Sequence, residues 1–172
     1  MNTRQERTED ARSRFGAAER LDDGHIRVRF ERALEHSIER VWAALVDPSE
    51  LAKWFPEVKL EPRPGGRFQI EFGGREGGDC DGPAVVSGEI EHFEPPRLLQ
   101  CGTMRWELEP AGTGCILRFS DVVAPEAGRT DQQLASSVLG GWHRYLDALE
   151  EALAGRMVDR TKPEVEYTGR LL

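Results

Sequence analysis

Near the end of the chain, apolar side chains recur at the three- and four-residue spacing of an amphipathic helix. The series consists of Leu134, Val138, Gly141, Trp142, Tyr145, Leu149 and Leu153. Thr130 and Gln133 form a capping-box pattern just before it, which predicts where the helix begins. At 1.5 Å per residue, the series predicts a helix about 35 Å long. Gly140 and Gly141 cost this helix about 1 kcal/mol each relative to alanine, which indicates close backbone packing or a bend.

The middle of the chain alternates apolar and polar side chains, which is the pattern of half-buried strands. In the clearest example, Ile26, Val28 and Phe30 share one face of a predicted strand. The same pattern predicts further strands at about 57–61, 67–72, 84–93, 98–108 and 115–123. Tight turns join these strands, among them a Pro-Pro corner after Glu94. We therefore expect a curved antiparallel sheet of about six to seven strands.

Two short helices are predicted between the first strand and the second. The first follows Ser37, a residue type that caps helices, and carries apolar side chains at helical spacing up to Leu45. Asp47 and Pro48 then combine the capping residue and the first-turn residue of a second helix, which Pro56 ends. The predicted order is strand, two short helices, antiparallel strands and one long helix, which is an α+β arrangement.

The length and composition of the chain indicate one folded domain with polar extensions. A chain of 172 residues can bury a core without disulfides or metal. Residues 1–23 are highly charged and residues 156–172 are polar, so we expect a mobile N-terminal arm, a domain at 24–155 and a polar C-terminal tail. The sequence contains neither an apolar run of about 18 residues nor a secretory signal, so we expect no membrane span and no export.

The net charge excludes one class of partner, and the cysteine content indicates the compartment in which the protein is expected. The formal net charge of −8, without a dense block of basic residues, argues against nucleic-acid binding. Cys80, Cys101 and Cys115 are odd in number and show no CxxC spacing, which favours free thiols in a reducing cytoplasm. Cys101 and Cys115 fall in predicted strands and are expected to be small core residues. Cys80 lies in a Gly-rich segment without a partnered base.

The sequence contains no motif for metal, cofactor or nucleophilic chemistry. GxSxG and HExxH are absent, and metal-ligand spacing is lacking among the histidines, which are His25, His36, His92 and His143. The Gly-rich segment 73–82 joins two strands, so it lacks the helix that a phosphate-binding loop needs; we expect a surface loop or a flap at a cavity mouth. Arg105 and Glu107 alternate with Met104 and Trp106, and we expect the apolar pair to face inward. We therefore expect no metal and no cofactor, and we assign no catalytic residue.

Several segments together carry a resemblance to a known family. They are Val41–Trp42 with Asp47–Pro48 and Leu51–Trp54, Gly65–Phe68, Gly88–Leu99, Gly112–Phe119 and Gly141–Leu149. In this order they make the chain similar to the SRPBCC superfamily (the START and pollen-allergen fold), and within it to the family named for the activator of heat-shock protein 90 ATPase. The resemblance spans about residues 26–154. It implies the helix-grip fold, in which a curved sheet wraps around the long C-terminal helix and leaves a hydrophobic cavity between them. It implies no fixed chemistry, because the family contains binding proteins, cyclases or hydrolases, and chaperone partners.

We expect the cavity to bind a small apolar or amphipathic molecule, because aromatic-rich concave pockets are the usual setting for such ligands. Two alternatives stay open. A cyclase- or hydrolase-like enzyme would need a buried polar pair in the same cavity. A chaperone or protein-interaction partner would show an exposed apolar patch outside it, and a homodimer is also compatible with the sequence. The predicted cavity lining consists of Trp54, Phe68, Ile70, Val86, Trp106, Phe119, Leu134, Val138 and Trp142.

Overall fold

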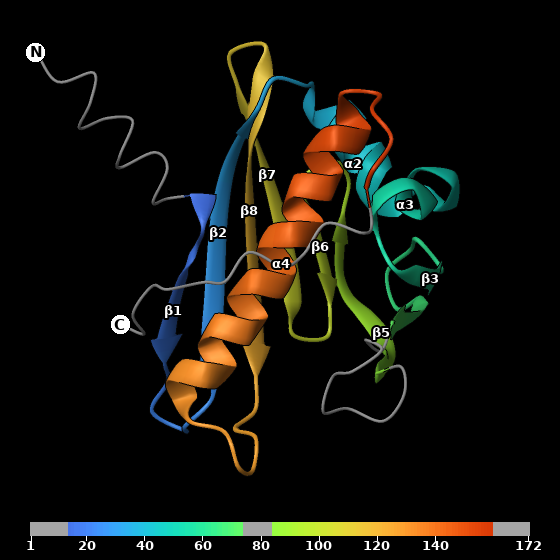
Figure 1. The fold of residues 1–172 in the computed structure, drawn as a ribbon. Helices are drawn as coiled ribbons and strands as arrows, with labels where there is room; N and C mark the ends of the chain where they lie inside the picture. Colours follow the sequence, from blue (N-terminus) through green and yellow to red (C-terminus); the bar gives the residue numbers. More distant parts are fainter. Residues whose placement is uncertain (1–13, 74–83, 160–172) are drawn as a thin grey trace, which may run out of the picture.

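The computed structural model describes residues 14–73 and 84–159. In chain order its elements are β1 (Ala17–Arg20), β2 (Ile26–Leu34), α2 (Ile38–Val46), α3 (Pro48–Trp54), β3 (Glu57–Leu60), β4 (Arg67–Phe72), β5 (Ala84–Glu94), β6 (Leu98–Cys101), β7 (Met104–Ala111), β8 (Gly114–Val123) and α4 (Asp131–Leu153). The strands form one antiparallel sheet in the order β1-β2-β8-β7-β6-β5-β4-β3. The long helix α4 crosses one face of this curved sheet, and α2 and α3 lie near its C-terminal end (Figure 1). The predicted α+β helix-grip arrangement is confirmed.

The described residues form eight strands instead of the six to seven predicted, for two local reasons. β1 lies within the segment 1–23 that the sequence assigned to the arm, and backbone pairing with β2 forms it without an alternating side-chain pattern. The segment 98–108, predicted as one strand, is divided into β6 and β7. Gly102 takes a φ of 58° there, a left-handed conformation that glycine adopts without steric cost and that lets the chain turn back.

Parts of three predictions lie outside the described residues. They are the Gly-rich loop beyond Gly73 with its Cys80, residues 1–13 of the arm, and residues 160–172 of the tail.

The core lies between α4 and the alternate, inward-facing side chains of the sheet. Leu139, Leu146 and Leu149 of α4 are 0% exposed, and the inward residues of β2, β7 and β8 are buried as well. The predicted helix starts are confirmed. The Asp47 carboxylate accepts a hydrogen bond from the Ser49 amide at 2.8 Å, and Thr130 closes a capping box at the start of α4.

Gly141 lies inside the continuous helix α4. It lacks the close backbone contact that was one of the two predicted reasons for a glycine at this position. No atom of the described residues lies within 4 Å of the position that a Cβ would take there. Gly114 is the opposite case, because a Cβ at that position would lie 2.1 Å from the carbonyl oxygen of Leu34. The first glycine therefore lowers helix stability without a packing benefit, and the second is required by its neighbour.

Gly141→Ala is expected to raise the free energy of unfolding by about 0.5–1 kcal/mol, because alanine has the higher helix propensity and the added methyl group meets open space. Urea denaturation followed by tryptophan fluorescence measures the change. Gly114→Ala is the matched control and is expected to destabilise the fold. Equal destabilisation by both substitutions would contradict the assignment of open space at Gly141.

Candidate functional site

An aromatic cluster fills the interior where α3, α4 and the sheet meet. Phe55, directly after α3, is central to it: its ring centroid lies 5.7 Å from that of Tyr145 and 6.2 Å from that of Trp142. The ring of Phe119 on β8 lies 4.2 Å from those of both Trp106 and Trp142. Aromatic pairs at such distances stabilise a core beyond the area that they bury. Side chains that were predicted to surround a cavity under α4 therefore pack against one another there.

A small apolar cavity remains beside this cluster, between α3 and the strands β3, β4, β6 and β7. Its volume is about 30 Å³, which is room for about one water molecule. Its wall contains no charged side chain among the described residues. The lining residues are Leu45, Leu51, Trp54, Phe55, Val58, Leu60, Phe68, Ile70, Leu99, Cys101, Met104 and Trp106.

The structure brings together some of the predicted cavity residues and separates others. Trp54, Phe68, Ile70 and Trp106 line the cavity. Val86 does not, because it lies in the first half of β5 and is 40% exposed. The remaining four predicted residues pack between α4 and the sheet and do not border the cavity. They are Phe119 of β8 and, in α4 itself, Leu134, Val138 and Trp142. The lining by β3 and by the β6–β7 hairpin was not predicted, because periodicity identifies an inward face but not which strands enclose a space.

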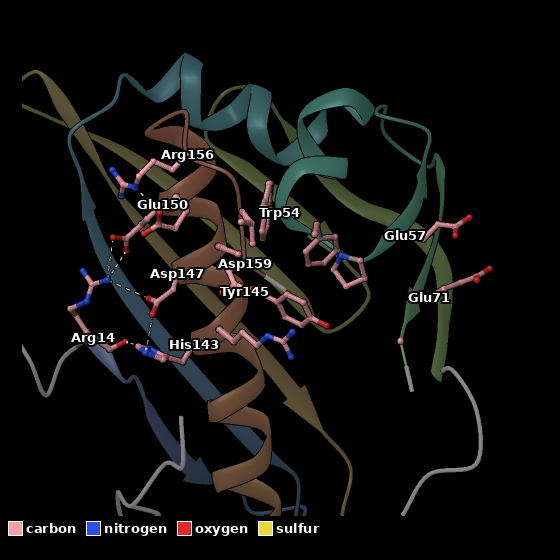
Figure 2. A pocket seen from close by; sticks show the side chains of 17 residues that line it. Arg14, Trp54, Glu57, Glu71, His143, Tyr145, Asp147, Glu150, Arg156 and Asp159 are labelled. Carbon is pink, nitrogen blue, oxygen red and sulfur yellow. Dashed lines mark hydrogen bonds and ion pairs between the residues drawn. The ribbon is translucent and has the colours of Figure 1, made fainter. Parts of the chain in front are cut away.

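A larger groove lies on the outer side, along the exposed surface of α4. Its volume is about 600 Å³, and it extends from the end of α3 across α4 to Arg14. Figure 2 shows Trp54 and Tyr145 on one side of α4, and Asp147 with Arg14 on the other. The groove thus has aromatic side chains at the α3 end, with Glu57 and Glu71 at its rim there, and a cluster of charged side chains at the β2 end. Phe55 and Trp54 belong to the walls of both the groove and the inner cavity.

The two side chains that separate groove and cavity are held differently. The indole nitrogen of Trp54 donates a hydrogen bond of 2.9 Å to the carbonyl oxygen of Ala44, which fixes the ring against α2. The phenyl ring of Phe55 has no polar atom, so packing alone holds it. Phe55 also follows the last residue of α3 and precedes Pro56 in an extended backbone. Its side chain is therefore the one that can leave its place without breaking a hydrogen bond.

Asp121 places a buried carboxyl group on the inward face of β8. It accepts hydrogen bonds from the Thr103 hydroxyl at 2.8 Å and from the Trp142 indole nitrogen at 3.1 Å. Burial raises the pKa of Asp121, and the two hydrogen bonds oppose that rise. The sequence analysis missed this residue, although its position two residues after Phe119 on an alternating strand was a usable signal.

A second polar cluster, which is centred on the buried Arg32, joins β2 to α4. The Arg32 guanidinium, 2% exposed, donates hydrogen bonds to Asp147 at 3.0 Å and to Glu150 at 2.9 Å. Arg14 also contacts both carboxylates, so two positive and two negative groups balance. His143 lies 2.9 Å from Arg32, and burial lowers its pKa, which favours the neutral ring. The cluster fixes the orientation of α4 and forms the charged wall of the groove. Arg32 was also missed, although it shares the inward parity of Phe30.

The remaining predicted groups take structural roles. Met104 and Trp106 face inward as predicted, while Arg105 and Glu107 form an ion pair on the outer face. Cys101 is buried, and burial raises its pKa to about 12, so the thiol stays protonated. No group of three metal-ligating side chains occurs among residues 14–73 and 84–159. None of the described helices is long and apolar enough to span a membrane.

Comparisons with known proteins agree on one family and one fold. A family model described as Activator of Hsp90 ATPase homolog 1-like protein matches residues 35–154. No curated protein matches the chain.

Solved structures share the fold at low sequence identity. CalU16 from Micromonospora echinospora is 23% identical with a TM-score of 0.58, over 81% of this chain and 83% of its own. An uncharacterised protein from Rhizobium leguminosarum is 22% identical with a TM-score of 0.61, over 82% and 99%. DynU16, a protein of the dynemicin biosynthetic locus, is 22% identical with a TM-score of 0.60, over 77% of this chain and 49% of its own. At these identities the structures support the fold alone.

Asp121→Asn is expected to change how stability depends on pH. Because burial raises the pKa of this carboxyl group in the folded state, its stabilising contribution is complete below the ordinary value of 3.8 and is lost as pH rises through the folded value. Wild type should therefore lose stability relative to the asparagine variant as the pH increases from acid to neutral. Urea denaturation at several pH values, followed by tryptophan fluorescence, measures this difference. A difference that stays constant with pH would contradict the prediction, because it would show that folding leaves the pKa of Asp121 unchanged.

Proposed function

The chain belongs to the Activator of Hsp90 ATPase homolog 1-like family, and from that premise we propose that it binds a small apolar or amphipathic molecule in the inner cavity, which lies between α3 and the sheet and not, as expected, between α4 and the sheet. The ligand enters from the outer groove and takes the place of the Phe55 ring. Its apolar part occupies the enlarged inner cavity, and its polar part, where it has one, lies in the groove.

The observation that carries this proposal is the wall shared by the groove and the inner cavity. Two aromatic side chains make up that wall, and one of them, Phe55, is held by packing alone. The cavity of about 30 Å³ is too small for any organic ligand, so binding requires this side chain to move. An apolar wall on the inside and charged side chains at the far end of the groove match the two ends of an amphipathic molecule.

The energetics favour such an exchange for a ligand of modest size. Removing the Phe55 side chain from the interior costs about 1.5–3 kcal/mol. A ligand that buries roughly 200 Å² of apolar surface gains about 5 kcal/mol at 25 cal/mol per Å². The surplus of about 2–3.5 kcal/mol has to offset the loss of ligand freedom, so hydrogen bonds at the groove are needed for tight binding.

The chemistry of the cavity favours binding over the cyclase or hydrolase alternative. Its one titratable lining residue among the described residues is Cys101, whose pKa of about 12 keeps the thiol protonated. The buried polar groups Asp121 and Arg32 lie outside the cavity wall and are already engaged by structural partners. The wall thus offers apolar contact and no acid–base pair.

Phe55→Ala is expected to connect the groove with the cavity. Loss of the buried ring should lower the free energy of unfolding by about 3–5 kcal/mol. It should also increase the affinity for an apolar fluorescent dye such as anilinonaphthalene sulfonate at least about tenfold, because the space opened takes the naphthalene ring without displacing a side chain. Dye titration of the folded variants measures this affinity.

Phe93→Ala is the matched control. The ring centroid of Phe93 lies 5.5 Å from that of Trp42, and Phe93 borders neither the cavity nor the groove. It should destabilise the fold without a gain in dye affinity. Equal dye affinity of the Phe55 variant and wild type would overturn the proposed route. Native mass spectrometry of the protein purified from its own host then tests for a retained small molecule, and repeated recovery of the bare chain mass would count against the proposed function.

A further inference from the structure

The first half of β5 has an unpaired edge. β5 begins at Ala84, but its register with β6 starts only at Ile90, opposite Cys101. On the other side, residues 84–89 pair with β4. β6 ends at Cys101 and the chain turns back through Gly102, so none of the described strands lies beside residues 84–89 on that side (Figure 1). Backbone amide and carbonyl groups of this half therefore face outward without a strand partner in the described part of the chain.

Apart from Glu89 at its end, the side chains along this edge are uncharged and largely apolar. Val85 is 54% exposed and Val86 is 40% exposed, although neighbouring residues of a strand point to opposite faces. Met157 is the other exposed large hydrophobic residue of the described ranges. Residues 84–88 contain neither a charge nor Pro or Lys, which are the features that commonly protect the edge strands of natural sheets.

We propose that this edge is a homodimer interface, at which β5 of one copy pairs antiparallel with β5 of a second copy. Strands β3, β4 and β5 of the two copies then form one continuous six-stranded sheet across the dimer axis. An antiparallel strand edge is self-complementary under a twofold axis, because each residue meets the same surface patch on the other copy. None of the described residues of β5 lines the groove or the inner cavity, so the interface can form without closing the proposed ligand route.

Charge favours a second copy at this edge over other parts of the surface. The chain carries a formal net charge of −8, so two copies repel each other across most of their surfaces. Residues 84–88 are neutral, so this edge is a place where two copies can approach without that repulsion. A twofold axis that passes beside Val86 sets this valine opposite Val86 of the other copy and places the two Glu89 carboxylates on opposite sides of the axis, which keeps them apart. The same register sets Val85 opposite Ser87, a small side chain that leaves room for the valine.

Val85→Lys tests the proposal with little risk to the fold. Val85 lies opposite Glu71 on β4, so a lysine there gains a partner of opposite charge within its own sheet. In the dimer, the substitution places a charged side chain at each half of the interface. We expect wild type to sediment at twice its 19.3 kDa chain mass, and the variant to dimerise with a dissociation constant at least about tenfold higher. Analytical ultracentrifugation over a concentration series measures both.

Met157→Lys is the matched control, because it makes the same change at a side chain that is 96% exposed and lies outside β5. It should leave the dimer unchanged. Hydrogen exchange provides a second readout: amides of residues 84–89 should become more protected as wild-type concentration rises. A monomer at every concentration, a dimer that Val85→Lys leaves intact, or an edge that instead takes up an added extended peptide while the chain stays monomeric would each overturn the proposal. Ligand binding at the groove can still be observed in each of these cases, so the two proposals fail separately.

Discussion

The burial of one face of α4 against the concave side of the sheet is the interaction on which the rest of the structure depends. This helix has 23 residues, and the leucines along its inner face are completely buried. No other described element offers an apolar surface of that length, so the sheet has to curve to follow it. The apolar stripe of α4 decides which face of the helix turns inward. The ion pairs of Arg32 with Asp147 and Glu150 add a polar constraint at the β2 side, because a buried guanidinium is stable only where carboxylates reach it.

The same patterns explain why much of the fold, and less of the site, could be predicted from the sequence. Alternation and helical spacing depend on neighbouring residues, so they predicted the helices and the capping residues correctly, and the inward faces of β2, β4, β7 and β8, but wrongly placed Val86 of β5 in the buried interior. β1 was missed because its four residues have no alternation and are held by pairing with β2. The division of 98–108 was missed because it depends on the backbone of one glycine, Gly102.

The candidate site depends on three-dimensional neighbours, which periodicity does not report. Trp54 and Trp106 were correctly placed near an inner space, but the pattern could not show that Phe55, at the end of α3, separates this space from the surface. Asp121 and Arg32 were hidden for a different reason. Each is a polar residue in the inward phase of a strand, and we had weighed the charged residues of the outward phase instead.

One irregularity in β5 links the inner cavity to the open edge. The register of β5 against β6 shifts between Ile90 and His92, and at this point the strand changes from pairing with β6 to pairing with β4 alone. A bulge of this kind bends a strand and increases its twist. The bend carries β3 and β4 to the side of the molecule where α3 lies, and the apolar cavity forms between them and the β6–β7 hairpin. The same change of partner leaves residues 84–89 with one free edge. A sheet that stayed paired along the whole of β5 would lose the unpaired edge, and without the bend it would also lose the space beneath α3.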